Sequence, residues 1–249
     1  MTRNYEFAQV VFDVSTAHSY FHDASCAYLS NEISECHIDV TSNDIEYERQ
    51  AFLTSEDSKT FVFSSSVLEH QAVLRKVSAT LVDHDAFLFH ASAIDVDGEG
   101  YLFTAKSGTG KSTHASFWKS HFGERCMYVN DDKPFLRYKE GSVYVYGSPW
   151  NGKHKLGNNV RSKVKAICIL ERGKENTATL KDPSDAIPKL LQQTYRPNDA
   201  QKYLKTLDML NSVVDTVPIF DITCNLSESA GLEIYSAVNN ILDQRGAIR

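Results

Sequence analysis

Short alternations of apolar and polar residues dominate the beginning of the chain. Three segments alternate with a period of two, as half-buried strands do: YEFAQVVFDV (5–14), ISECHIDV (33–40) and TFVFS (60–64). Between the last two, SNDIEYERQAF (42–52) has the spacing of a helix. The pattern therefore predicts a small α+β arrangement at the N-terminus.

A longer amphipathic segment follows, from Ser66 to Asp85. It opens with a serine suited to cap a helix. Three apolar residues then share one helical face: Leu74, Val77 and Leu81. We therefore expect one long helix here. We also expect two domains, a small N-terminal region over residues 1–84 and a main domain over residues 85–249.

The main domain begins with strand-like runs on either side of a glycine-rich turn. AFLFHASAIDVDGEGYLFTA (86–105) contains two such runs separated by Asp97 and Gly98, which is a strong hairpin signal. STHASFWKSHFG (112–123) fits a helix, and CMYVNDD (126–132) fits a buried strand with acids at its end. We therefore expect the second strand of the hairpin to end near residue 105, followed by a glycine-rich turn before residue 112 and then a helix.

Strands and helices continue to the end of the chain. The expected strands are SVYVYGS (142–148), VKAICIL (164–170), TATLK (177–181) and IFDITCN (219–225). The expected helices cover 184–195 and 198–214, and a last one begins at SES (227–229). Together these elements predict an α/β fold with a mixed sheet.

Composition narrows the class of protein. The 249 residues carry a formal net charge of -6 and no block of Lys or Arg, so nucleic acid is a poor candidate partner. No run is long and apolar enough for a membrane span, and MTRNYEFAQ at the start does not resemble a secretion signal. The five cysteines form no C-x-x-C pair. We expect a cytoplasmic protein with reduced thiols.

The segment from Ala105 to Ser112 fits the phosphate-loop pattern G-x-x-x-x-G-K-[ST] except at its first position. In such a loop, Lys111 reaches the β- and γ-phosphates and Ser112 binds Mg²⁺. Ala105 is tolerated if its backbone lies outside the positive-φ region. The residues expected to bind nucleotide are Ser107, Gly108, Thr109, Gly110, Lys111, Ser112 and Thr113. The alternative is a glycine-rich turn with no ligand.

Two acids follow the loop, in the segment YVNDDKP (128–134). After a phosphate loop, an acid at the end of the next strand normally holds the metal ion. Adjacent acids can divide the work, one deprotonating an acceptor hydroxyl and the other binding Mg²⁺. Asp131 and Asp132 are the candidates. The alternative is a solvated turn that Pro134 ends.

The order of three motifs resembles a known superfamily. FHASAI with His90, SGTGKST and NDD are similar to the catalytic domain of HPr kinase/phosphorylase and phosphoenolpyruvate carboxykinase, over about residues 86–240. The resemblance implies that ATP and Mg²⁺ bind at Lys111 and Ser112. It further implies that Asp131 is the base towards a serine hydroxyl, that Asp132 helps to bind metal and that His90 lies near the phosphates. Without the resemblance, His90 would be a hydrogen-bonded core residue.

The chain departs from HPr kinase after the Asp pair. It lacks that enzyme's glycine-rich signature around a Glu and an Arg and carries YGSPWNGKHKLGNN (146–159) instead. This stretch is similar to a feature of smaller HPr-kinase-like proteins, some of which phosphorylate serine in ribosomally made peptides such as lasso-peptide precursors. The resemblance is therefore nearer to these peptide or protein serine kinases, and it does not imply HPr as the substrate.

The same stretch supplies candidates for contacting the transferring phosphate. A turn between Pro149 and Gly152 would bring one of three residues towards it: Lys153, His154 or Lys155. Of these we select Lys153. Arg161 and Arg172 are further candidates, although each would also suit a structural ion pair. The alternative for the stretch is a surface turn anchored by a buried Trp150.

These observations favour an ATP- and Mg²⁺-dependent kinase that acts on a hydroxyl, most simply serine of a protein or peptide. Two alternatives stay open. One is a small-molecule kinase or carboxykinase-like enzyme, and the other is a nucleotide-binding sensor without catalysis. The resemblance also implies that the chain forms a homo-oligomer. No nucleic-acid or membrane partner is expected.

Overall fold

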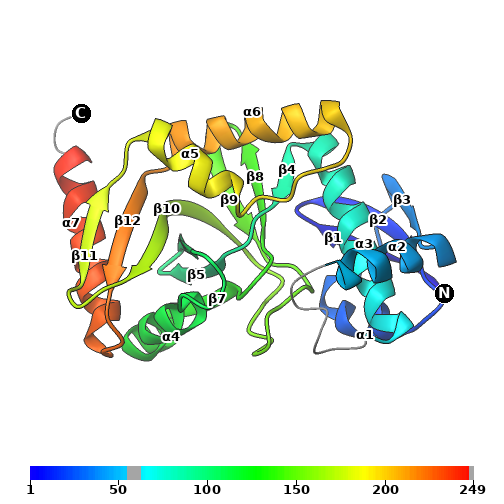
Figure 1. Cartoon of the computed structure of the whole chain (residues 1–249), viewed down its shortest axis with the longest axis horizontal. Coiled ribbons are helices and arrows are strands. Elements are labelled where there is room, and N and C mark those ends of the chain that lie inside the picture. The colour runs from blue at the N-terminus through cyan, green and yellow to red at the C-terminus, as the bar shows by residue number, and fades with distance from the viewer. Residues whose placement is uncertain (55–62, 247–249) are drawn as a thin grey trace. The chain divides into compact units, whose positions relative to one another are not determined.

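A computed structural model describes residues 1–54 and 63–246 of the chain. The chain divides into two compact units, Met1–His84 and Asp85–Arg249. Figure 1 shows the course of the chain through both. No helix in the described part is both long and apolar enough to cross a bilayer. All five cysteines lie in that part, and none of them forms a disulfide.

The first unit contains a three-stranded sheet in the order β1-β2-β3. β1 (Thr2–Phe7) and β2 (Val10–Ser15) form an antiparallel hairpin, and β3 (Cys36–Asp39) runs parallel to β2. Ala8 and Gln9 make the hairpin turn with φ of 50° and 64°. The segment predicted as strand over 5–14 is therefore two strands, because a tight turn lies inside it.

Three helices accompany this sheet: α1 (Tyr20–Ala24), α2 (Ser42–Leu53) and α3 (Ser65–Leu81). The last two confirm the predicted helices, and the predicted apolar face of α3 is buried. Ser64 is the N-cap residue of α3, so the helix begins earlier than the predicted cap at Ser66. Residues 60–62 of the predicted strand TFVFS lie outside the described residues.

The second unit is built on a mixed, branched sheet (Figure 1). Its main path runs through β4 (Ala86–Leu88), β8 (Phe135–Lys139), β9 (Ser142–Tyr146), β10 (Arg161–Arg172), β6 (Glu99–Thr104), β5 (Ser92–Val96) and β7 (Cys126–Asn130). β12 (Ile219–Cys224) pairs in parallel with the second half of β10, and β11 (Thr177–Leu180) pairs with β12. The chain thus has an α/β fold with a mixed sheet.

Four helices complete this unit: α4 (Lys111–Phe122), α5 (Pro183–Leu191), α6 (Ala200–Thr216) and α7 (Ser229–Gly246). α4 packs beside α7, and α5 packs beside α6 (Figure 1). Fully buried Trp118 of α4 lies between Tyr101 and Phe103 of β6 and Tyr235 of α7. This aromatic core fixes α4 against the strand that leads into it.

Strand direction brings three distant segments to one edge of this sheet. β5 is antiparallel to both β6 and β7, so β6 and β7 run in the same direction. Their C-terminal ends therefore meet beside the start of β5. β10 is parallel to β6, so it also ends at this edge. Ligands of α/β sheets bind beyond such C-terminal strand ends.

Candidate active site

The loop of residues 105–110, here called the phosphate loop, joins β6 to α4. Gly108 and Gly110 have φ of 76° and 122°, a backbone conformation that other residues adopt only with strain. Ala105 is buried and is not among the residues with positive φ, so its methyl group is accommodated. The predicted order of strand, glycine-rich loop and helix is thus present, and α4 directs its N-terminus to the loop.

Lys111 begins α4 and is half-buried. Its Nζ donates to the carbonyl of Ala105 at 3.5 Å, which is a long hydrogen bond. Burial lowers the pKa of Lys111, the charge of Asp132 opposes this effect and the charge of Lys133 adds to it. Lys111 is therefore a partly desolvated cation, and it lies close enough to Asp132 for their charges to interact. A bound phosphate would stabilise it.

Arg172, at the end of β10, holds the outside of the phosphate loop. Its Nε donates to the carbonyl of Thr109 at 2.9 Å, and its Nη2 donates to the carbonyl of Gly108 at 2.6 Å. The guanidinium is therefore engaged by loop carbonyls, whereas the sequence had suggested a contact with transferring phosphate. β10 brings it there because that strand ends beside β6.

Arg161, the other arginine considered, lies at the opposite end of β10. It stacks over the ring of Tyr144 at 5.7 Å and pairs in the sheet with Tyr146. Lys163, two residues later, is already level with the first residue of β6. Arg161 is therefore separated from the phosphate loop by the length of β6, and the suggestion that it contacts transferring phosphate was wrong.

Asn130, the last residue of β7, organises the turn that carries the two acids. Its Oδ1 accepts hydrogen bonds from the backbone N–H of Asp132 at 2.8 Å and of Lys133 at 2.6 Å. Its Nδ2 donates to the carbonyl of Ser148 and to Oδ1 of Asn151. Sequence reasoning missed this fully buried residue, although an Asn before two acids and a Pro is typical of such a turn.

Asp131 is buried, with 4% of its surface exposed. One carboxylate oxygen, Oδ1, accepts a hydrogen bond from the backbone N–H of Gly152 at 2.7 Å. Its backbone carbonyl accepts from the hydroxyl of Ser92, the first residue of β5. Asp131 is thus held between the start of β5 and the stretch that the sequence had singled out after the Asp pair.

Asp132 pairs with His90. Nε2 of His90 lies 3.2 Å from Oδ1 of Asp132, and the ammonium of Lys133 contacts the other carboxylate oxygen. Burial raises the pKa of Asp132, but the hydrogen bonds and charges of His90 and Lys133 outweigh it and lower this pKa to about 2. Asp132 is therefore ionised at any physiological pH.

His90 connects the Asp pair to the strand that precedes the phosphate loop. Its carbonyl accepts from the hydroxyl of Thr104, the last residue of β6, at 2.9 Å. Its N–H donates to the carbonyl of Gln193 at 2.7 Å. The imidazole retains 37% exposure. His90 is therefore a partly exposed residue at the strand ends, and the alternative of a core histidine does not describe it.

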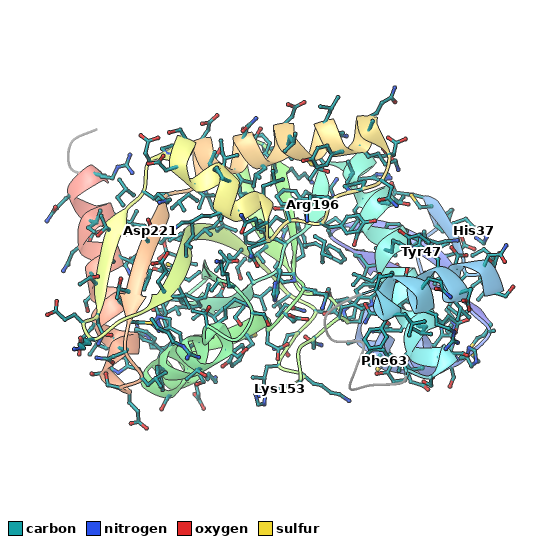
Figure 2. The ribbon with its side chains drawn as sticks, in the orientation of Figure 1. His37, Tyr47, Phe63, Lys153, Arg196 and Asp221 are labelled. Carbon is teal, nitrogen blue, oxygen red and sulfur yellow. The ribbon has the colours of Figure 1, made fainter. Side chains whose placement is uncertain are left out.

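The segment of residues 147–160, called here the 147–160 loop, packs against the Asp pair. Trp150 is buried against the edge of Phe135, as the surface-turn alternative required for that side chain. Gly152 reaches Asp131, however, so the loop is also part of the candidate site. Lys153, in the middle of the loop sequence, is exposed (Figure 2). Its predicted contact with transferring phosphate stays a prediction.

A pocket of about 550 Å³ lies beside the phosphate loop and the end of β10. It is lined by residues 104–109, by the end of β10 over 169–172, and by Lys189, Gln192 and Gln193. Lys189 is held in place by Glu171 and Asp221, and Asp221 is labelled in Figure 2. The sequence did not reveal this pocket, because α5 and the end of β10 are far from the loop along the chain.

Within residues 1–54 and 63–246, no group of three or more His, Cys, Asp or Glu side chains is arranged to hold a metal ion. Mg²⁺, however, usually takes only one or two carboxylates and completes its shell with water and substrate phosphates. Ser112 is half-buried in the first turn of α4, and Asp132 is an ionised carboxylate. A hydroxyl and a carboxylate are the kinds of oxygen donor that Mg²⁺ takes together with substrate phosphates.

Comparisons with known proteins give a distant likeness among solved structures. A scan against protein-family models found no match, and neither did a search of curated proteins. Among solved structures, the chain is similar to the Hpr(Ser) kinase/phosphatase from Coxiella burnetii, with 12% identity and a TM-score of 0.38. The match covers 64% of this chain and 98% of that chain. A likeness at this TM-score and identity does not carry a function for the chain.

Proposed function

We propose that the chain is an ATP- and Mg²⁺-dependent kinase that transfers the γ-phosphoryl group to a hydroxyl, specifically serine of a protein or peptide. The observation that carries the proposal is the meeting of three separated motifs. Thr104, which precedes the phosphate loop, donates to the carbonyl of His90, and His90 in turn pairs with Asp132. Lys111, which follows the loop, has a charge that interacts with that of Asp132. A phosphate-binding group, a buried carboxylate and an ionised carboxylate thus share one sheet edge.

In this proposal the two sides of the phosphate loop have different tasks. The phosphates bind the backbone N–H groups of residues 107–113 and the ammonium of Lys111. The nucleoside extends into the pocket beside β10, whose volume of about 550 Å³ lies in the range of small-molecule sites. The γ-phosphate then faces the Asp pair, where the acceptor approaches.

The transfer step follows from these positions. Asp131 takes the proton of the acceptor hydroxyl, the hydroxyl oxygen bonds to the γ-phosphorus, and the bond to the β,γ-bridging oxygen breaks with its electron pair leaving on ADP. Lys111 neutralises charge on the phosphoryl oxygens. Mg²⁺, held by Ser112 and Asp132, would supply further positive charge at the phosphates. His90 orients Asp132, and Lys153 remains a candidate contact for the moving phosphoryl group.

The proposal is tested with two variants and labelled ATP. Asp131→Asn preserves the acceptor for the Gly152 N–H but removes the base, so nucleotide affinity should hold while transfer falls by about 10²–10⁴-fold. Lys111→Ala should lose nucleotide binding itself. Asp208→Asn, at an exposed position of α6, is the matched control for Asp131→Asn. Mass spectrometry of species labelled in a cell lysate identifies the acceptor.

Other outcomes would select the alternatives. Nucleotide binding by the wild type, without transfer to any peptide or metabolite, would indicate a sensor. A label found only in small metabolites would indicate a small-molecule kinase. Full activity of Asp131→Asn would remove Asp131 from the role of base, and unchanged nucleotide affinity of Lys111→Ala would contradict the assignment of the phosphate loop.

A further inference from the structure

The 147–160 loop carries three consecutive basic side chains on its exposed end. Lys153, His154 and Lys155 are all exposed, and we call them the basic tip. The chain as a whole has a formal net charge of -6. A run of basic groups beside the candidate site therefore has the opposite sign to the average surface.

The base of this tip is held firmly. A turn closes between the N–H of Lys155 and the carbonyl of Gly152 at 3.1 Å, and the N–H of Gly152 donates to Asp131. Lys155 has φ of 51°, a left-handed conformation that is uncommon for a residue with a side chain. The tip thus begins one residue from the contact to the proposed base.

Within the described residues, ion pairing distinguishes the basic tip from other lysines of the second unit. Among the residues that the structure describes, no Asp or Glu forms an ion pair with Lys153 or Lys155. Elsewhere in the second unit, lysines pair within the fold: Lys165 with Glu99, Lys181 with Asp221 and Lys205 with Asp85. Among residues 1–54 and 63–246, the two lysines of the tip thus have no acidic side chain as an ion-pair partner.

We propose that the basic tip binds carboxylates of the acceptor, so that the substrate class is an acidic peptide segment around the serine. This inference rests on the proposed kinase function. The serine must reach Asp131, and the tip starts beside Asp131, so the carboxylates belong within a few residues of the serine. Exposed ion pairs between lysines and carboxylates give modest affinity, but they fix the register of the bound peptide and disfavour peptides of the wrong charge.

A nucleic acid fits this surface less well. Nucleic-acid binding relies on an extended basic surface that neutralises many phosphates. The tip offers three residues on one loop of an acidic protein. A peptide with two carboxylates matches the charges of Lys153 and Lys155.

The experiment measures binding and transfer separately. Fluorescent synthetic peptides carry one serine flanked by Asp, by Ala or by Lys, and their binding is followed by anisotropy with a non-hydrolysable ATP analogue present. The test variant is Lys153→Glu with Lys155→Glu. The control, Lys163→Glu with Arg245→Glu, makes the same change in charge at exposed positions on β10 and α7. Transfer from labelled ATP gives KM and kcat for each peptide.

The wild type and the control should bind the Asp peptide about fivefold more tightly than the Ala peptide, and added salt should reduce the difference. The test variant should lose this preference and favour the Lys peptide. For Lys153→Glu alone, a higher KM for the Asp peptide at constant kcat supports acceptor binding. An equal fall of kcat for all peptides would instead assign Lys153 to the transferring phosphate.

Equal binding of the Asp and Ala peptides by the wild type would overturn the inference, as would equal behaviour of the test variant and the control. Stronger binding of an RNA oligonucleotide than of the Asp peptide would also overturn it. If the Asp peptide binds through the basic tip but no phosphate is transferred, the proposed kinase activity is contradicted and the proposed role of the tip is supported. If phosphate is transferred with no preference for acidic peptides, only the proposed role of the tip is contradicted.

Discussion

The phosphate loop and the 147–160 loop both reach the same sheet edge, but they use glycine for different reasons. Gly108 and Gly110 have positive φ, and a Cβ built on either would meet nothing within 4 Å. Gly147 and Gly157 have no such conformation, yet a Cβ would lie 1.8 Å from the carbonyl oxygen of Asn158 and 1.9 Å from Oδ1 of Asn151, respectively. One loop needs glycine for its backbone, and the other needs it for close packing.

The two loops therefore differ in what determines their conformation: neighbouring residues in one, and contacts with distant residues in the other. The phosphate loop takes its conformation from residues that are close in sequence, between a strand and the helix that follows it, and distant Arg172 adds two hydrogen bonds to it. The 147–160 loop is fixed by contacts with β7 and with the residue after it: the N–H of Asn158 donates to the carbonyl of Val129, and the N–H of Gly152 donates to Asp131. Nucleotide binding and phosphoryl transfer should therefore respond differently to damage in the two loops.

The largest effect is expected for Gly147→Ala. The added methyl group collides with backbone atoms of Asn158, which is tied to Val129, so relief requires the 147–160 loop to move. We expect a loss of about 1–3 kcal/mol in the free energy of unfolding. Transfer should fall by about a hundredfold because Asp131 is displaced. Nucleotide affinity, measured by calorimetry, should stay close to that of the wild type.

Gly141→Ala is the control for this variant. Gly141 lies in the turn between β8 and β9 with φ of 73°, and its Cβ would meet nothing within 4 Å. The substitution should cost about 1 kcal/mol through backbone strain alone. If Gly147→Ala were destabilised and yet transferred phosphate as well as Gly141→Ala, the 147–160 loop would not belong to the site.

A smaller effect is expected at the phosphate loop for Arg172→Lys. The guanidinium binds two carbonyls at once, and an ammonium keeps the charge without reproducing this fork. Loss of one such hydrogen bond is worth about 1 kcal/mol, so nucleotide affinity should fall about fivefold. Calorimetric titration with nucleotide measures the change. A larger effect on kcat than on nucleotide affinity would instead indicate that Arg172 contacts the transferring phosphate directly.

Sequence reasoning succeeded where structure is local. The strand before the phosphate loop, the hairpin at Asp97 and Gly98, α4 and β7 are all present as predicted. It missed β8, a short strand that pairs with distant β4 as well as with neighbouring β9, and it missed the pocket beside β10. It missed Asn130 because the role of an amide side chain depends on where Ser148 and Asn151 fold.

The smallest predicted effect concerns Asp132 and its dependence on pH. The pKa of Asp132 is lowered to about 2 in the folded protein, because His90 and Lys133 outweigh its burial. A carboxylate with a lowered folded pKa contributes stability that is fully present above its unfolded pKa of about 3.9 and is lost as pH falls through about 2.

Between pH 5 and pH 3, the wild type should therefore lose about 1 kcal/mol more free energy of unfolding than Asp132→Asn. Urea denaturation at both pH values measures this difference. Asp208→Asn, at an exposed position, should follow the wild type. Parallel pH profiles of the wild type and Asp132→Asn would show that the pairing with His90 and Lys133 adds no stability. The turn that carries the Asp pair would then be held by its hydrogen bonds with Asn130, Ser92 and Gly152, and the ion pairs of Asp132 would add nothing to them.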